Sequence, residues 1–145
     1  MTERPAAATA VEDAAADGAP HQARAAMLDR FVACWNVHDL DGLMSCFTED
    51  CVFWSSSGPT PQGGVFEGRE AVAAASGALF KAFPDAAWTE SRISLFGDRA
   101  LWEWTFVGTA AGGAATRVLG VDVLELSGDR IGRKNSFRKA VVPAA

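Results

Sequence analysis

Four segments in which polar and apolar residues alternate fill the second half of the sequence. They span residues 87–96, 100–109, 116–126 and 130–141, and the turns between them are Gly97-Asp98, Ala111-Gly112-Gly113 and Ser127-Gly128-Asp129. A period of two residues is typical of strands with one buried face. Because turns this short connect antiparallel neighbours, the sequence predicts a four-stranded antiparallel meander.

The first half of the sequence predicts three helices. Apolar residues recur there at the spacing of one helical face in three stretches. The first stretch begins at Pro20, the second follows Asp39, which can cap a helix, and the third ends before Pro84. A short strand at 51–54 and a loop at 55–64 separate the second and third helices. This order predicts an α+β fold in which a curved antiparallel sheet wraps around three helices from the N-terminal half.

Length and charge limit the classes of protein to consider. A chain of 145 residues, 49% of them hydrophobic, can form one domain without disulfides or metals, and we assign that domain to residues 20–141. The Ala-rich, acidic residues 1–19 are expected to form a disordered tail and lack the pattern of a secretory signal. No run of about 18 apolar residues predicts a membrane span. The net charge of -5 argues against nucleic-acid binding.

The cysteines favour a reducing compartment. Cys34, Cys46 and Cys51 form an odd set with no CxxC motif and no histidine at ligand spacing. This pattern indicates reduced core thiols and neither a disulfide framework nor a zinc site. We therefore expect a cytoplasmic protein that binds no metal and no cofactor.

Strand alternation directs one polar cluster into an aromatic interior. Trp102, Trp104 and Phe106 share the face expected to meet the helices. On the third meander strand Asp122 shares its inward face with Leu124, and on the last strand Ser136 lies between Lys134 and Arg138 on one face. The short turn at residues 127–129 places Asp122 opposite Ser136 and diagonal to Lys134. The neighbouring cations are expected to keep Asp122 ionised.

Three stretches of the sequence carry a family resemblance. They are Arg30–Gly42 followed by Phe47–Asp50, then Phe66–Val72, and then Gly120–Leu124 with Gly128–Ile131. Together they resemble the nuclear transport factor 2-like superfamily, which includes SnoaL-like polyketide cyclases and ketosteroid isomerases. The resemblance covers about residues 27–139. It implies a cone-shaped fold with an internal pocket between the helices and the sheet.

The resemblance carries over few catalytic residues. It places Phe31 where ketosteroid isomerases have an oxyanion-hole tyrosine, and Ser55, next to Trp54, near their general base. Asp122 corresponds to their second oxyanion donor, an aspartic acid kept protonated by apolar surroundings. Ala110 stands where SnoaL-like cyclases commonly have a histidine. Steroid isomerisation by the usual mechanism is therefore not expected.

Two interpretations of the polar cluster remain open. In the first, Asp122 acts as a general base or orienting group, Lys134 or Arg138 holds an enolate or carboxylate, and Ser136 donates a hydrogen bond. In the second, Asp122 and Lys134 form a buried ion pair that fixes the strand register. The residues expected to contact the substrate are Phe31, Trp35, Trp54, Ser55, Trp102, Trp104, Phe106, Leu124 and Arg138.

The resemblance implies a cofactor-independent isomerase, cyclase or lyase. Its ligand is expected to be small, largely apolar and cyclic, like a polyketide or a steroid. A non-catalytic small-molecule-binding protein and a dimeric interaction protein of the same fold are the alternatives. Apolar residues on the outward sheet face also predict a homodimer that packs through the sheet. They are Leu101, Val107, Val121, Val123 and Phe137.

Overall fold

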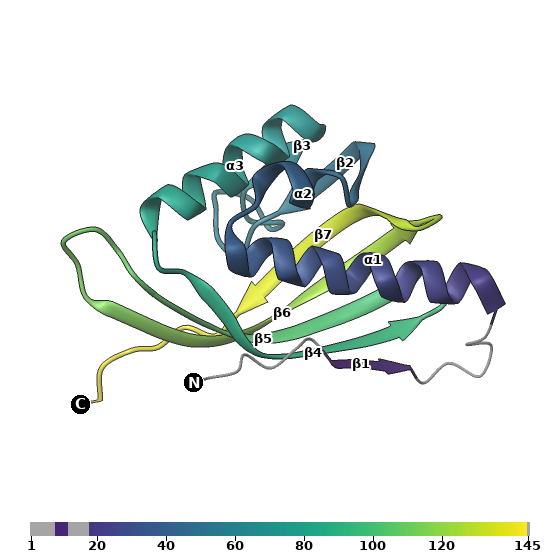
Figure 1. The fold of residues 1–145 in the computed structure, drawn as a ribbon. Coiled ribbons are helices and arrows are strands. Elements are labelled where there is room, and N and C mark those ends of the chain that lie inside the picture. The colour runs from purple at the N-terminus through teal and green to yellow at the C-terminus, as the bar shows by residue number, and fades with distance from the viewer. Residues whose placement is uncertain (1–7, 12–17, 145) are drawn as a thin grey trace.

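The computed structural model describes residues 8–11 and 18–144. Helices and sheet form two layers, with α1 and α3 on one face of a strongly curved sheet (Figure 1). The elements in chain order are β1 Ala8–Val11, α1 Gly18–Val37, α2 Leu40–Met44, β2 Phe47–Trp54, β3 Val65–Glu67, α3 Arg69–Ala82, β4 Ala87–Phe96, β5 Arg99–Thr109, β6 Ala115–Ser127 and β7 Arg130–Arg138. The predicted α+β class is confirmed.

The sheet contains the predicted meander at its centre. Its strand order is β1-β4-β5-β6-β7-β2-β3, and β4 to β7 pair with their sequence neighbours in antiparallel fashion. Strand β2 pairs with β7 in parallel, and the unpredicted strand β3 pairs with β2. These additions extend the sheet beyond the meander and curl it toward α3 (Figure 1).

Part of the predicted disordered tail has regular structure. Residues 8–11 form β1, which pairs with β4 in parallel, and residues 18–19 belong to α1. The rest of that tail, residues 1–7 and 12–17, lies outside the described residues. Within the described ranges, no helix is long and apolar enough to cross a membrane.

Hydrogen bonds fix α1 across the sheet at both of its ends. Near its start, Arg24 donates to the backbone carbonyls of Gly97 and Gly128, which lie in two hairpin turns. Near its end, the Asn36 amide pairs with both the backbone N–H and the carbonyl of Trp88 on β4, at 2.7 and 3.2 Å. The apolar face of α1 is therefore held against the meander.

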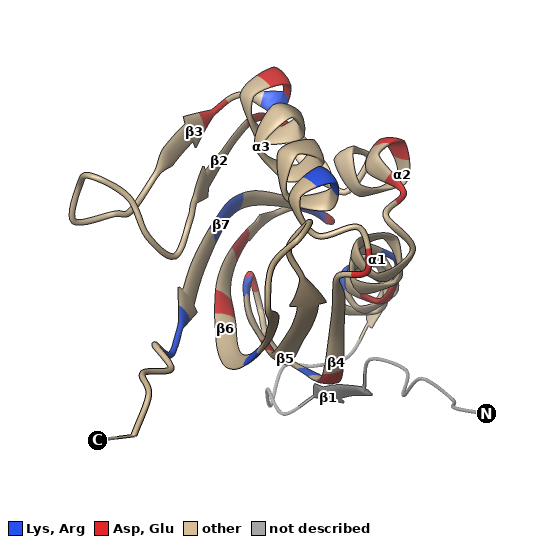
Figure 2. Cartoon of the chain, turned by 90° about the vertical axis from the view of Figure 1, so that its left-hand side faces the viewer, with Lys and Arg blue, Asp and Glu red and all other residues tan. Residues whose placement is uncertain are grey.

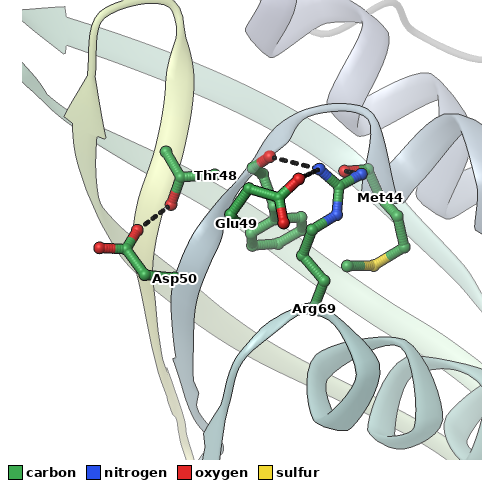
Figure 3. A network of polar contacts seen from close by, with 6 residues as sticks. Met44, Thr48, Glu49, Asp50 and Arg69 are labelled. Carbon is green, nitrogen blue, oxygen red and sulfur yellow. Dashed lines mark hydrogen bonds and ion pairs between the residues drawn. The ribbon is translucent and has the colours of Figure 1, made fainter.

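A corner around Arg69 joins α2, β2 and α3 (Figure 3). The guanidinium donates to the carbonyl of Met44 at 2.8 Å and to the carbonyl of Phe47 at 3.4 Å. It also lies 3.8 Å from the carboxylate of Glu49. Asp39 caps the short helix α2, as predicted, by accepting from the N–H of Gly42. These contacts set the start of α3 above the sheet.

Candidate functional site

A cavity of about 680 Å³ lies between α3 and the concave face of the sheet. This volume is in the range of sites that take drug-sized molecules. The residues that line it are Trp35, Phe53, Ser55, Ser56, Phe66, Ala71, Ala74, Ala75, Ala78, Leu79, Trp88, Trp104, Phe106, Lys134, Ser136 and Arg138. Most of this wall is apolar, and its polar groups belong mainly to β7.

The cavity exists because α3 presents small side chains toward it. Ala71, Ala74, Ala75 and Ala78 follow the spacing of one helical face and all line the cavity. Larger residues at these positions would fill the space against the aromatic wall of the sheet. This alanine face was missed as a site feature in the sequence prediction, although its spacing is visible there.

A buried hydrogen-bonded chain lies at the cavity wall. Nζ of Lys134 donates to Oγ of Ser136 at 2.9 Å, and that hydroxyl donates to Oδ1 of Asp122 at 2.6 Å. Asp122 and Ser136 are direct cross-strand partners, as predicted. The three residues are 1% (Asp122), 6% (Lys134) and 9% (Ser136) exposed. Lys134 and Ser136 line the cavity, whereas Asp122 does not.

Burial disfavours the charged form of Lys134. Burial lowers the pKa of Lys134 below its ordinary value near 10.5, and the carboxylate of Asp122 opposes this shift. The ammonium lies 3.2 Å from Oδ2 of Asp122, which accepts no hydrogen bond from the described residues. Nζ also lies 4.3 and 5.0 Å from the ring centroids of Phe53 and Trp35, where the ring faces attract a cation. Burial therefore favours the amine form of Lys134, whereas Asp122 and the two rings favour the ammonium.

The indole ring of Trp104 covers one side of the cavity because its cross-strand partner is Gly120. A Cβ at Gly120 would overlap Cη2 of that ring. Trp104 therefore lies across β6, and its N–H is buried without an acceptor among the described residues. The indole N–H of Trp35 is also buried and has no acceptor among the described residues. Both rings line the cavity.

The loop at 55–64 holds Ser55 at the rim. Its N–H donates to the carbonyl of Gly64, and the N–H of Gly64 donates to its hydroxyl at 3.0 Å. Gly63 has a φ of 85°, and a Cβ there would overlap the carbonyl of Ser55. Ser55, predicted to contact substrate, lines the cavity together with Ser56, which the sequence prediction did not include.

Four residues predicted to contact the substrate do not line the cavity: Phe31, Trp102, Leu124 and, as described below, Trp54. Phe31, Trp102 and Leu124 are fully buried in the core and do not line the cavity. Phe31 packs edge-to-face on Trp102 with ring centroids 5.4 Å apart, and the indole N–H of Trp102 donates to Ser91. These side chains belong to the buried core. Alternation identified the inward face of Trp102 and Leu124 correctly but gives no measure of depth along a strand, and Phe31 lies on the buried face of α1.

Trp54 lies on the opposite face of β2 from the cavity. Phe47, Cys51 and Phe53 are the buried residues of this strand, so its alternation turns Trp54 outward. Its ring stacks under the guanidinium of Arg133, 4.3 Å from the ring centroid, and Phe53 lines the cavity instead. Phe53, Phe66 and Trp88 are lining residues that the sequence prediction missed. The alternation within residues 51–54 and 87–96 could have identified Phe53 and Trp88 as inward-facing residues.

The three cysteines lie in the core as free thiols. Burial raises the pKa of Cys34, Cys46 and Cys51. None of them lines the cavity. Across the described ranges, no group of three His, Cys, Asp or Glu side chains is arranged to hold a metal ion.

Sequence comparison gives one family match. The family model for the SnoaL-like domain matches residues 28–133, which include every element from α2 to β6, the second half of α1 and the first four residues of β7. Comparison with curated proteins finds no match.

Several solved structures share the fold. The chain is similar to a nuclear transport factor 2-like protein of unknown function from Mesorhizobium loti, with 23% identity, coverage of 90% of this chain and 98% of that one, and a TM-score of 0.71. It is also similar to a proposed polyketide cyclase from Xanthomonas campestris pv. campestris, with 16% identity, coverage of 82% and 92%, and a TM-score of 0.72. A proposed SnoaL-like polyketide cyclase from Jannaschia sp. CCS1 has 18% identity, coverage of 85% and 90%, and a TM-score of 0.72. At these identities the likeness shows a common fold.

Proposed function

Since this chain belongs to the SnoaL-like domain family, we propose that it acts on a small, largely apolar cyclic carbonyl compound by cofactor-independent acid–base chemistry. The observation that carries this proposal is the chain Lys134–Ser136–Asp122, which borders an aromatic cavity. Buried ionisable groups in a cavity large enough for a ligand are typical of catalytic sites. The expected reaction is an isomerisation, cyclisation or elimination.

Lys134 is the proposed proton carrier. Its amine form takes a proton from a carbon next to the substrate carbonyl, which leaves an enolate beside the new ammonium. Return of the proton to another carbon completes an isomerisation. Alternatively, the enolate carbon attacks a second carbonyl carbon and closes a ring, and the oxygen of that carbonyl then takes the proton from the Lys134 ammonium. Ser136 contacts both Lys134 and the cavity, and Asp122 acts as a positioning residue because it does not reach the cavity surface.

Proton exchange at carbon tests the proposal without knowledge of the natural substrate. The probe is 2-tetralone, a cyclic ketone with acidic C–H groups, incubated in D2O and followed by proton NMR. The protein should accelerate deuterium uptake, and Lys134→Met should abolish the acceleration, while Lys139→Met, at an exposed position, should not. The pKa of Lys134 is lowered, so the rate should rise with pH to a plateau, with the midpoint of the rise below pH 10.5.

A non-catalytic binding protein is the second candidate. The position of Asp122 away from the cavity surface favours it, because the carboxylate expected from the family resemblance then contacts no ligand. Binding of 2-tetralone without accelerated exchange would support this candidate and contradict the catalytic one. If Lys134→Met does not fold, the double variant Asp122→Asn/Lys134→Met, which removes both charges, replaces it in the comparison.

A further inference from the structure

The charged groups on the cavity wall are both cations. Of the lining residues, Lys134 and Arg138 carry a charge, and none is Asp or Glu. Lys134 is paired with Asp122 and Ser136. The guanidinium of Arg138 makes no hydrogen bond or ion pair with the described residues and lies 5.7 Å from the ring centroid of Phe106. Arg138 is therefore an exposed cation that lines the cavity and has no polar partner within residues 8–11 and 18–144.

The hydroxyls of Ser136 and Ser55 on the wall already have partners among the described residues. The hydroxyl of Ser136 donates to Asp122 and accepts from Lys134. The hydroxyl of Ser55 donates to the carbonyl of Ser57 and accepts from the N–H of Gly64. The two buried indole N–H groups of the wall, on Trp35 and Trp104, are donors without partners. A ligand group that matches this wall accepts hydrogen bonds and carries negative charge.

The spacing of the two cations suggests how such a ligand lies. Lys134 and Arg138 are four residues apart on one face of β7, with Ser136 between them, so their Cα atoms are separated by about 13 Å along the strand. Basic residues follow β7 while acidic residues lie along β6 (Figure 2). The rings of Trp104 and Phe106 line the cavity beside them.

We propose that the ligand is an acidic ring compound whose carboxylate binds Arg138, with its ring against Phe106 and Trp104 and its carbonyl end toward Lys134. A planar guanidinium matches a carboxylate through two parallel hydrogen bonds, whereas an ammonium cannot. This inference rests on the proposed function, because it assumes that the cavity takes a ring compound. Beyond the proposed function, the inference states that the ligand is acidic and that Arg138 binds its carboxylate.

Isothermal titration calorimetry with two matched probes tests the inference. The probes are 2-naphthoate and 2-naphthamide, which share ring and shape and differ in charge. The protein should bind naphthoate at least about tenfold more tightly. Arg138→Gln should remove this preference by weakening naphthoate alone, and Arg138→Lys should restore only part of it. Lys139→Gln is the control, since it changes the net charge equally at a neighbouring position that does not line the cavity.

The outcomes separate the two proposals. Equal binding of both probes to the unmodified protein would overturn the acidic ligand. A preference for naphthoate that survives Arg138→Gln would overturn the assignment of Arg138 as its anchor. Both outcomes leave the ring site intact. Binding of naphthamide to Arg138→Gln shows that the variant keeps its cavity. Failure of both naphthalenes to bind the unmodified protein would instead contradict the proposed ring site, and the assignment of Arg138 with it.

Discussion

At the scale of single residues, the buried charge of Lys134 depends on Asp122. Burial disfavours an ammonium by several kcal/mol, and a paired carboxylate offsets much of that cost. Burial lowers the pKa of Lys134 in the folded protein. At pH values below that lowered pKa, the ammonium is present in both states and its burial destabilises the folded protein by the full amount. The cost disappears as the pH rises through the ordinary value near 10.5, because the unfolded chain then also loses the proton. This residue therefore contributes to stability most favourably at alkaline pH.

Removal of one member of the pair should be far more harmful than removal of both. We expect Asp122→Asn to lower the free energy of unfolding by about 3–5 kcal/mol, since it leaves a buried ammonium unpaired. The double variant Asp122→Asn/Lys134→Met should recover most of this loss, as measured by urea unfolding. Asp122→Asn should also move the pH profile of deuterium exchange downward, because it removes the charge that raises the pKa of Lys134. If the pair is purely structural, the protein does not accelerate deuterium exchange, and no such pH profile is observed.

At the scale of elements, helix α3 determines whether the molecule has a cavity. Its alanines face the aromatic wall formed by β2, β4 and β5, and the space between them is the proposed ligand site. An empty apolar space costs stability, because the atoms around it lose dispersion contacts. The alanine face is thus a local loss of packing at the site proposed to hold a ring.

Filling this space should improve stability and abolish binding. Ala75→Leu adds three carbon atoms to the cavity wall, so we expect an unchanged or higher melting temperature together with loss of 2-naphthamide binding by calorimetry. Ala82→Leu at the exposed end of the same helix is the matched control and should leave binding unchanged. Retained affinity in Ala75→Leu would place the ligand outside the cavity.

Sequence patterns predicted the elements better than the site. The meander and the pairing of Asp122 with Ser136 followed from alternation and a short turn, which are local properties. The placement of Phe31 and Trp102 in the closed core depends on how far each residue lies from α3, and local patterns do not contain this distance. Strand β3 has only three residues, too few for its own period to show. Trp54 directly follows Phe53 on β2, so the two side chains point to opposite faces, and Phe53 is the one that lines the cavity.

At the scale of the whole molecule, the outer face of the sheet retains exposed apolar groups. Phe137 is 51% exposed, while the other four residues of the predicted interface are half-buried within the single chain. Leu119, which was not part of that prediction, is 53% exposed. Phe137, Leu119 and Val121 line one pocket together with the charged residues Glu103, Arg138 and Lys139. We propose a second copy of the chain as the occupant of this face, because the self-complementary contact of a twofold dimer would cover it on both copies.

Light scattering after size-exclusion chromatography tests the dimer. At micromolar concentration the protein should have the mass of two chains, and Phe137→Glu should convert it to a single chain by placing a charge in the apolar contact. Val141→Glu, at a residue that is also exposed but lies beyond β7, should leave the mass unchanged. A monomeric mass for the unmodified protein would exclude the dimer.

The position of Trp104 across β6 lets a residue outside the cavity determine which ligands fit inside it. Gly120 permits this position although it does not itself line the cavity. A larger residue at 120 would displace the indole and so change the width of the site from behind its wall. The range of ligands accepted can therefore diverge among descendants of this chain through a residue that no ligand touches, while Lys134, Ser136 and Asp122 stay unchanged.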